Sequence, residues 1–169
     1  MSNLKNLTDT ERLILANQYE LLSKLAESEY ETAHFLRYSK QLKDGHKWLY
    51  KQIFDCISEN LDDESAVFVV NVLSLHRALL NSYEQLKTKK QLKKADVTFK
   101  GFDGNNESSL MYFVEALDDA SRFSEVIENG ELNSHFPMTS TYQKMLAKWK
   151  ELGEKFELSE EQILQIIED

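Results

Sequence analysis

The chain has 169 residues, of which 41% are hydrophobic and 29% charged, and its formal net charge is −9. A chain of this length and composition buries enough surface to fold without a metal ion or a disulfide, so we expect an ordered globular protein. The acidic balance argues against general binding to a phosphate backbone. The single cysteine, Cys56, excludes an internal disulfide.

Neither a secretory leader nor a membrane span is expected. The stretch MSNLKNLTDTER lacks the apolar run of about 7 to 15 residues that a leader needs. The longest apolar run, AVFVV at residues 66–70, is far shorter than the roughly 20 residues that cross a bilayer. These observations predict a cytoplasmic protein without a membrane partner.

Helical spacing dominates the first third of the chain. A first helix is predicted to begin near Thr8, because Thr8 and Glu11 fit a capping box. A second is expected over about residues 28–43, ended by Gly45, and a third over roughly 46–59. The residues expected to face inward are Leu15, Tyr19, Leu22 and Ala26, then Tyr30, Ala33, Phe35, Leu36 and Leu42, then Trp48, Leu49, Ile53 and Ile57.

The longest helix is predicted from residue 62 to about 91. It opens with Asp62, Asp63 and Glu64, whose charges suit the positive end of a helix dipole. Two adjacent apolar stripes indicate contact with several neighbours, so we expect it to be the central helix. A third stripe is small and polar, and is expected either to face water or to allow another helix to approach closely: Asn71, Ser74, Ala78, Asn81 and Gln85.

The stretch VTFKGFDGNNESS, residues 97–109, differs from the rest because apolar and polar residues alternate at its start. It is predicted to be a short extended connector that covers the helical core and leads into the next helix, capped by Asn105 or Asn106. Its edge is a second candidate role, as a strand that pairs with another copy. Asp103 is expected either to form the turn or to lie as a polar group in a pocket.

Three further helices are expected, at about residues 106–127, 141–152 and 158–169, and Ser159 with Gln162 fits a capping box. The stretch between the first two reads as a loop. We therefore predict an all-α fold, a single multihelical domain over residues 1–169 with about six to eight helices around a long central helix and one short extended connector.

Three segments resemble the bacterial YfbU family: ERLILANQYELLSKL, VTFKGFDG, and PMTSTYQKMLAKWKEL with LSEEQILQII. Their most specific parts are NQY at residues 17–19, VTFKGFD at 97–103 and YQKML at 142–146. The resemblance covers nearly the whole chain and implies an all-helical fold that tends to self-associate. The family has no agreed activity, so the resemblance supplies no catalytic residue.

One dense basic patch stands out in this acidic chain. It consists of Lys87, Lys89, Lys90, Lys93, Lys94 and Lys100. Lysines that follow a helix complement its dipole without any partner, and this is the favoured interpretation. Anion or nucleic-acid contact is the alternative, although no arginine is present in the patch to give bidentate contacts.

No catalytic, metal or cofactor motif is recognised. Glu31 and His34 have the spacing of a di-iron ligand pair, but one copy does not make a dinuclear site. The acidic group at residues 115–119 is expected to be a solvated helix face with an ion pair to Arg122. Cys56 is expected to be buried and inert because of its apolar neighbours.

The leading prediction is a non-enzymatic helical protein without a cofactor, which acts by self-association, with a dimer as the first expectation, and by binding a protein or a small ligand. The alternatives are a regulator that contacts nucleic acid through the lysine patch and a hydrolase that uses Asp103 or the carboxylates of residues 115–119. His76, on an apolar stripe, is expected to lie in the core or at an interface. The candidate ligand or interface residues are Asn17, Gln18, Tyr19, His76, Phe99, Phe102, Asp103, Tyr142 and Trp149.

Overall fold

The structure, a computed structural model, describes residues 6–58 and 60–168. Within these ranges the regular structure is entirely helical, so the predicted all-α class is confirmed, and the one β feature is an isolated bridge between Phe102 and Asn133. The chain forms two compact units, residues 1–60 and 61–169, and a single domain over 1–169 stays a prediction. Residues 1–5, the first part of the stretch that is expected not to be a secretory leader, lie outside the described ranges. In the described part, no helix has both the length and the apolarity needed to cross a membrane.

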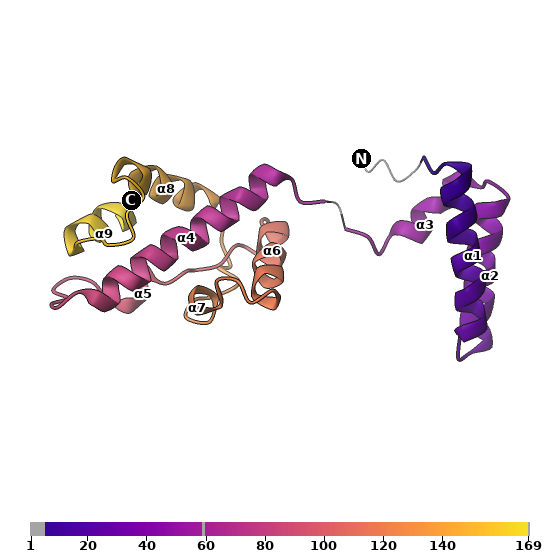
Figure 1. The fold of residues 1–169 in the computed structure, drawn as a ribbon, viewed down its shortest axis with the longest axis horizontal. Helices are drawn as coiled ribbons and strands as arrows, with labels where there is room; N and C mark the ends of the chain where they lie inside the picture. The colour runs from indigo at the N-terminus through magenta and orange to yellow at the C-terminus, as the bar shows by residue number, and fades with distance from the viewer. Residues whose placement is uncertain (1–5, 59, 169) are drawn as a thin grey trace. The chain divides into compact units, whose positions relative to one another are not determined.

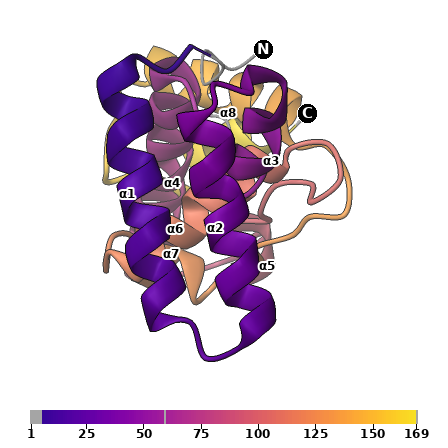
Figure 2. The same cartoon turned by 90° about the vertical axis from the view of Figure 1, so that its right-hand side faces the viewer.

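The first unit is a helical hairpin, in which α1 (Asp9–Leu25) and α2 (Glu29–Lys43) lie side by side (Figure 2). The predicted capping box is confirmed, since the Thr8 hydroxyl and the Glu11 carboxylate each accept a hydrogen bond from the other's backbone amide. The 3₁₀ turn η2 (Lys47–Leu49) and the short helix α3 (Tyr50–Phe54) follow. The expected third helix over 46–59 is therefore much shorter than predicted.

The contact between the two long helices of the hairpin combines small buried side chains of α1 with Leu15 and Tyr19, which were expected to face inward and are partly buried against the same core. Ala16 and Ser23 are the buried residues of α1, whereas the expected inward residue Leu22 is 42% exposed. Other residues expected inside are exposed as well: Tyr30, Ala33, Leu36, Trp48 and Ile57. Cys56 is also exposed, contrary to the prediction of burial, because α3 ends before it. The hairpin thus leaves much of its apolar surface uncovered.

The second unit is built around α4 (Asp63–Gln85), which contacts α5, α6, α7 and α8, as the prediction of a central helix requires (Figure 1). Asp62 caps it by accepting a hydrogen bond from the Ser65 amide at 2.8 Å. The helix ends at Gln85 rather than near residue 91, because Leu86 has an extended backbone. The core along α4 includes the fully buried Val69, Val72 and Leu75.

The remaining helices of this unit are α5 (Lys94–Val97), α6 (Ser108–Asp119), α7 (Ser124–Ile127), α8 (Thr139–Glu151) and α9 (Glu160–Ile167). The predicted helix over 106–127 is interrupted, because Ser121 and Phe123 both have positive φ. The predicted cap by Asn105 or Asn106 is wrong, since Glu107 stands at the N-cap of α6. The capping box of Ser159 and Gln162 is confirmed. Short turns therefore make up a larger part of the second unit than helical spacing predicts.

Candidate functional site

The stretch VTFKGFDG crosses the interior of the second unit and is paired on both sides. On one side, the Glu131 amide donates to the Phe99 carbonyl at 2.9 Å, and the Phe102 amide donates to the Leu132 carbonyl at 3.1 Å. On the other side, the Tyr142 hydroxyl accepts from the Lys100 amide and donates to the Gly101 carbonyl, both at 3.1 Å. The backbone predicted to offer an edge to another copy is therefore occupied by its own chain.

Gly101 permits this close pairing. Its φ is +81°, a conformation that side chains rarely adopt. A Cβ at this position would lie 2.2 Å from the Leu132 carbonyl oxygen. The glycine of the stretch is thus required both by the backbone angle and by the neighbouring chain.

Four aromatic rings of the candidate set meet at this stretch. The His76 ring lies 5.5 Å from Phe99 and 5.5 Å from Tyr142, and Phe102 lies 5.4 Å from Tyr142. All four side chains are at most 2% exposed. All four were candidate ligand or interface residues, and in the structure they form a packed interior. Phe99 in particular has no surface with which to bind another copy.

His76 contains an unsatisfied polar atom in this interior. Its Nδ1 lies 3.0 Å from the Val97 carbonyl oxygen, which accepts a hydrogen bond from the protonated nitrogen, while Nε2 has no partner within residues 6–58 and 60–168. Burial lowers the pKa of His76 to about 4, and the positive charge of Lys100 acts in the same direction, against the effect of the Val97 hydrogen bond. His76 is therefore neutral at physiological pH. Burial also raises the pKa of Tyr142 above its ordinary value.

Two buried carboxylates organise the turn after this stretch. Asp103 accepts hydrogen bonds from the Asn105 amide at 3.1 Å and from the Asn106 side chain, and these hold its pKa below the usual value. Glu107 accepts from the amides of Met138 and Thr139 at the start of α8 and from the Thr139 hydroxyl. Burial opposes ionisation of Glu107, but these hydrogen bonds and that from the Asp103 amide keep its pKa low.

The carboxylates that the hydrolase alternative would use are Asp103 and those of residues 115–119. The Asp103 oxygens are engaged in the turn, and Glu115 and Asp119 lie on the exposed surface of α6. The expected ion pair with Arg122 does not occur among the described residues, because α6 ends at Asp119 and the chain turns before it reaches the arginine. These residues are not brought together into one site.

Trp149 lies beside an open cleft between α4 and α8, of about 430 Å³. Its indole Nε1 donates to the Lys155 carbonyl at 2.8 Å, and its side chain is largely buried. Two members of the small polar stripe of α4 contribute to this cleft, so this part of the stripe borders open space. The lining residues are Asn71, Ser74, Gln143, Leu146, Ala147, Trp149, Lys150 and Glu154.

Three lysines of the basic patch are engaged with their own chain. Lys89 donates to the Leu86 carbonyl at the end of α4 and lies 4.8 Å from the centre of the Tyr83 ring. Lys94 donates to the Asn129 side chain, and Lys100 to the Ala95 carbonyl and the Thr98 hydroxyl. The patch further comprises Lys87, Lys90 and Lys93, which are exposed. For Lys89 at least, these contacts favour the interpretation that the lysine complements the dipole at the end of α4.

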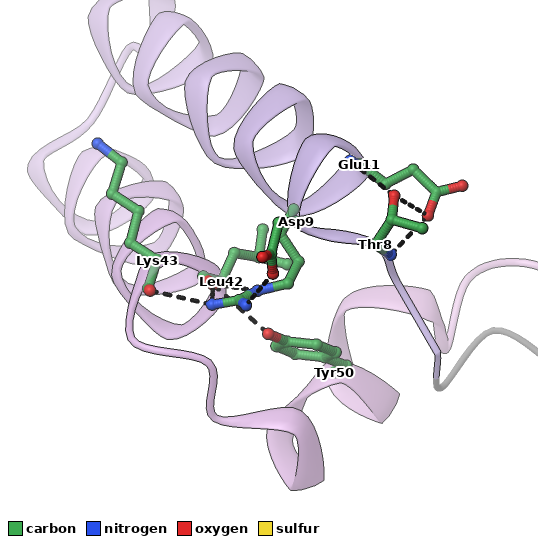
Figure 3. A network of polar contacts seen from close by, with 7 residues as sticks. Thr8, Asp9, Glu11, Leu42, Lys43 and Tyr50 are labelled. Carbon is green, nitrogen blue, oxygen red and sulfur yellow. Dashed lines mark hydrogen bonds and ion pairs between the residues drawn. The ribbon is translucent and has the colours of Figure 1, made fainter.

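In the first unit, an arginine that the sequence analysis did not single out joins the helices. The Arg12 guanidinium donates to the Leu42 carbonyl at 2.8 and 2.9 Å, to the Lys43 carbonyl at 3.0 Å and to the Asp9 carboxylate at 2.9 Å. Leu42 also accepts from the Tyr50 hydroxyl (Figure 3). Arg12 thus satisfies the last carbonyls of α2 and holds that end of the helix against α1.

The three residues of NQY point in different directions around α1. Tyr19 packs inside the hairpin, with its ring 5.3 Å from Tyr38 and 6.1 Å from Phe35, and burial raises its pKa. Asn17 and Gln18 are exposed. Only this exposed pair is therefore available to a partner.

Gln18 lies within an exposed seam on α1. We use the term α1 seam for Ile14, Gln18, Leu21 and Leu25, which recur at intervals of four, three and four residues. The exposed fractions of Ile14, Leu21 and Leu25 are 52%, 62% and 77%. This seam was not predicted, although its spacing is readable in the sequence, because α1 carries apolar residues on more than one face.

Comparison with known proteins was consistent with the resemblance in sequence. The family described as the YfbU domain matches residues 5–169. A UPF0304 protein of the archaeon Methanocaldococcus jannaschii is 35% identical over 169 aligned residues, which cover 95% of this chain and 98% of that protein. A relative of this kind therefore occurs outside bacteria, and a bacterial source for this chain stays a prediction.

Proposed function

This chain belongs to the YfbU family, and from that premise we propose that it is a cytoplasmic, non-enzymatic protein that acts by self-association through its N-terminal hairpin. The observation that carries the proposal is the exposed aliphatic surface of α1. Five large aliphatic side chains of this helix are between 42% and 77% exposed: Leu13, Ile14, Leu21, Leu22 and Leu25. A contiguous apolar surface beyond a few hundred Å² is uncommon on a protein that stays monomeric.

The small core of the hairpin supports the same proposal. Its buried apolar side chains are Ala16, Leu42, Tyr50 and Ile53. Two helices with so few buried side chains gain little from the hydrophobic effect, because a small unit buries a small share of its surface. A partner that covers α1 would supply the missing burial.

Charge favours the hairpin over the rest of the chain as the contact between copies. Residues 1–60 contain eight Lys and Arg against nine Asp and Glu, whereas residues 61–169 contain twelve against twenty. Two copies that meet through the nearly neutral unit avoid most of the repulsion between their acidic surfaces.

Light scattering coupled to size-exclusion chromatography tests the proposal. We expect the wild-type chain to have about twice its monomer mass of 19.7 kDa. The double variant Leu21→Lys/Leu25→Lys should be a monomer with unchanged helical circular dichroism. Leu36→Lys is the matched control, because Leu36 is a 47% exposed leucine on α2 and lies outside the α1 seam. A monomeric wild-type protein would end the proposal.

Small-ligand binding at the α4 and α8 cleft is a second candidate function. Its volume of about 430 Å³ lies in the range of ligand sites. The amides of Asn71 and Gln143 and the opposite charges of Lys150 and Glu154 suit a polar, zwitterionic molecule. Titration of a Trp48→Phe variant with free amino acids, followed by Trp149 fluorescence, is the test, because the chain has two tryptophans. An unchanged Trp149 signal throughout would remove this candidate.

A further inference from the structure

The α1 seam can be matched to one specific partner. We infer that it pairs with the α1 seam of a second copy, with the two helices parallel and in register, so that Gln18 faces Gln18. This inference rests on the proposed self-association and adds the contacting residues, their direction and their register.

The two faces of α1 have separate roles. Ala16 and Ser23, seven residues apart, are buried and face α2. At 3.6 residues per turn, Ile14, Leu21 and Leu25 fall on the opposite side of the helix. The hairpin contact and the seam therefore do not compete, and one copy can keep its own α2 while it binds another α1.

The four residues of the seam have the spacing by which one helix packs along another. Intervals of four and three residues keep a stripe facing a partner helix, so that side chains of one helix fit between those of the other. In residues 6–58 and 60–168, α1 is the one helix that exposes three large aliphatic side chains along a single stripe. A like seam is therefore available on a second molecule, and two hairpins joined in this way form a four-helix arrangement.

Gln18 selects among the pairings that two such helices allow. A side-chain amide has both donors and an acceptor, so two facing Gln18 side chains satisfy each other. An antiparallel pair that places Ile14 against Leu25 puts Gln18 against Leu21 and leaves each buried amide without a partner. An antiparallel pair centred on Gln18 instead places Leu25 against Glu11.

The parallel pairing avoids both the unpartnered Gln18 amides and the contact between Leu25 and Glu11. Each aliphatic side chain of the seam meets its own counterpart, and Glu11 stays at the end of the contact, where it already accepts hydrogen bonds from Thr8. Aligned helix dipoles oppose this arrangement only weakly, because their effect is confined to the exposed helix ends. A polar layer within an apolar seam is a known means of fixing register.

Charge complementation at Leu21 tests whether two copies of this position meet. Leu21→Lys and Leu21→Glu should each be monomeric alone, and an equimolar mixture should form a heterodimer by native mass spectrometry. Leu36→Lys and Leu36→Glu are the matched controls and should each remain dimeric. If the wild type dimerises and both Leu21 variants also dimerise alone, the inference is wrong while self-association stands. If the Leu21 variants are monomeric and their mixture is too, α1 binds some other surface and the inference is again overturned.

Cysteine cross-linking tests the direction of the helices. In a Cys56→Ser background, which removes the exposed native thiol, Leu25→Cys should form a disulfide-linked dimer under mild oxidation. A mixture of Ile14→Cys and Leu25→Cys that cross-links, while Leu25→Cys alone does not, would show an antiparallel pair and overturn the assigned register.

A third variant tests the role of Gln18. Gln18→Leu replaces the polar layer with an apolar one and should lower the dissociation constant of the dimer by roughly tenfold or more. An unchanged or weaker dimer would place Gln18 outside the contact.

Discussion

The stability of the second unit should depend on pH through His76. His76 is 2% exposed, its ring packs in edge geometry against the stacked rings of Phe99 and Tyr142, and Lys100 is the nearby positive charge. The pKa of His76 is lowered from 6.5 to about 4 in the folded protein. The unfolded chain therefore takes up a proton at this histidine as the pH falls from about 6.5, while the folded protein does so only near pH 4.

The sign and size of the effect follow from this difference. Because the unfolded state binds more protons between pH 6.5 and 4, acid destabilises the fold in that window. The pKa values of about 4 and 6.5 correspond to about 3 kcal/mol in total, and to about 2 kcal/mol between pH 7.5 and 5. The buried Glu107, whose ordinary value is 4.5, has a lowered pKa and so adds its own loss mainly below that pH.

Urea unfolding of a Trp48→Phe variant measures how the free energy of unfolding of the second unit depends on pH, because Trp149 is then the one tryptophan of the chain and lies in that unit. We expect the free energy of unfolding to fall by about 2 kcal/mol from pH 7.5 to 5. His76→Gln in the same background should lose most of this dependence, whatever its stability at pH 7.5. His135→Asn is the control, since His135 is exposed and asparagine tolerates its positive φ. Equal pH dependence in the His76→Gln variant and its parent would refute the reasoning.

Three further predictions use matched substitutions. Glu107→Gln should destabilise the second unit by about 2 kcal/mol in the Trp149 assay, because a buried acceptor of several amides loses its charge. The control Glu125→Gln, which removes the charge of an exposed ion pair with an arginine, should destabilise it by less than about 1 kcal/mol. Equal losses of stability in the two variants would contradict the role of Glu107 as a buried acceptor. Gly101→Ala should lower the free energy of unfolding by at least about 3 kcal/mol, because of its positive φ and the overlap of the new Cβ with a carbonyl oxygen. Gly153 has a φ of +78° and open space around it, so the control Gly153→Ala should lower it by about 1 kcal/mol. A loss of about 1 kcal/mol in Gly101→Ala as well would disprove the close approach of the two chains. Arg12→Lys should raise the rates of amide hydrogen exchange across α1 and α2, because lysine cannot make the several hydrogen bonds that the planar guanidinium donates. Unchanged exchange rates would show that the Arg12 contacts with α2 are not needed for the stability of the hairpin.

Two of the three helix caps predicted from neighbouring residues are confirmed, whereas the cap predicted at Asn105 or Asn106 is wrong. Thr8 with Glu11 and Ser159 with Gln162 cap their helices as expected, because each capping box is decided within four residues. The central helix was also predictable, because its apolar stripes extend over many turns. The sequence pattern was thus sufficient for these two caps and for the existence of the central helix, but not for the end of that helix at Gln85.

The positions that depend on distant partners were not predictable. Glu107 binds the start of α8, and its partner Met138 lies 31 residues away in the chain, so nothing near Glu107 signals the contact. The alternation at residues 97–100 predicted an extended backbone, but Val97 is the last residue of α5 and the extended backbone begins only at Thr98. The alternation also gave no sign that Phe99 pairs with residue 131. On α1, Leu15 and Tyr19 of the predicted inner face do pack against the hairpin core, but Leu22 is 42% exposed, and the burial of the small residues Ala16 and Ser23 was not predicted.

Sedimentation equilibrium of the wild-type chain over a wide range of concentrations, at about 0.1 M and 1 M salt, tests most directly whether α1 is a self-association surface. The account predicts a reversible monomer and dimer equilibrium that high salt does not weaken, because the contact is apolar and the hairpin is nearly neutral. A monomer of 19.7 kDa at every concentration, or a dimer that dissociates in high salt, would contradict it.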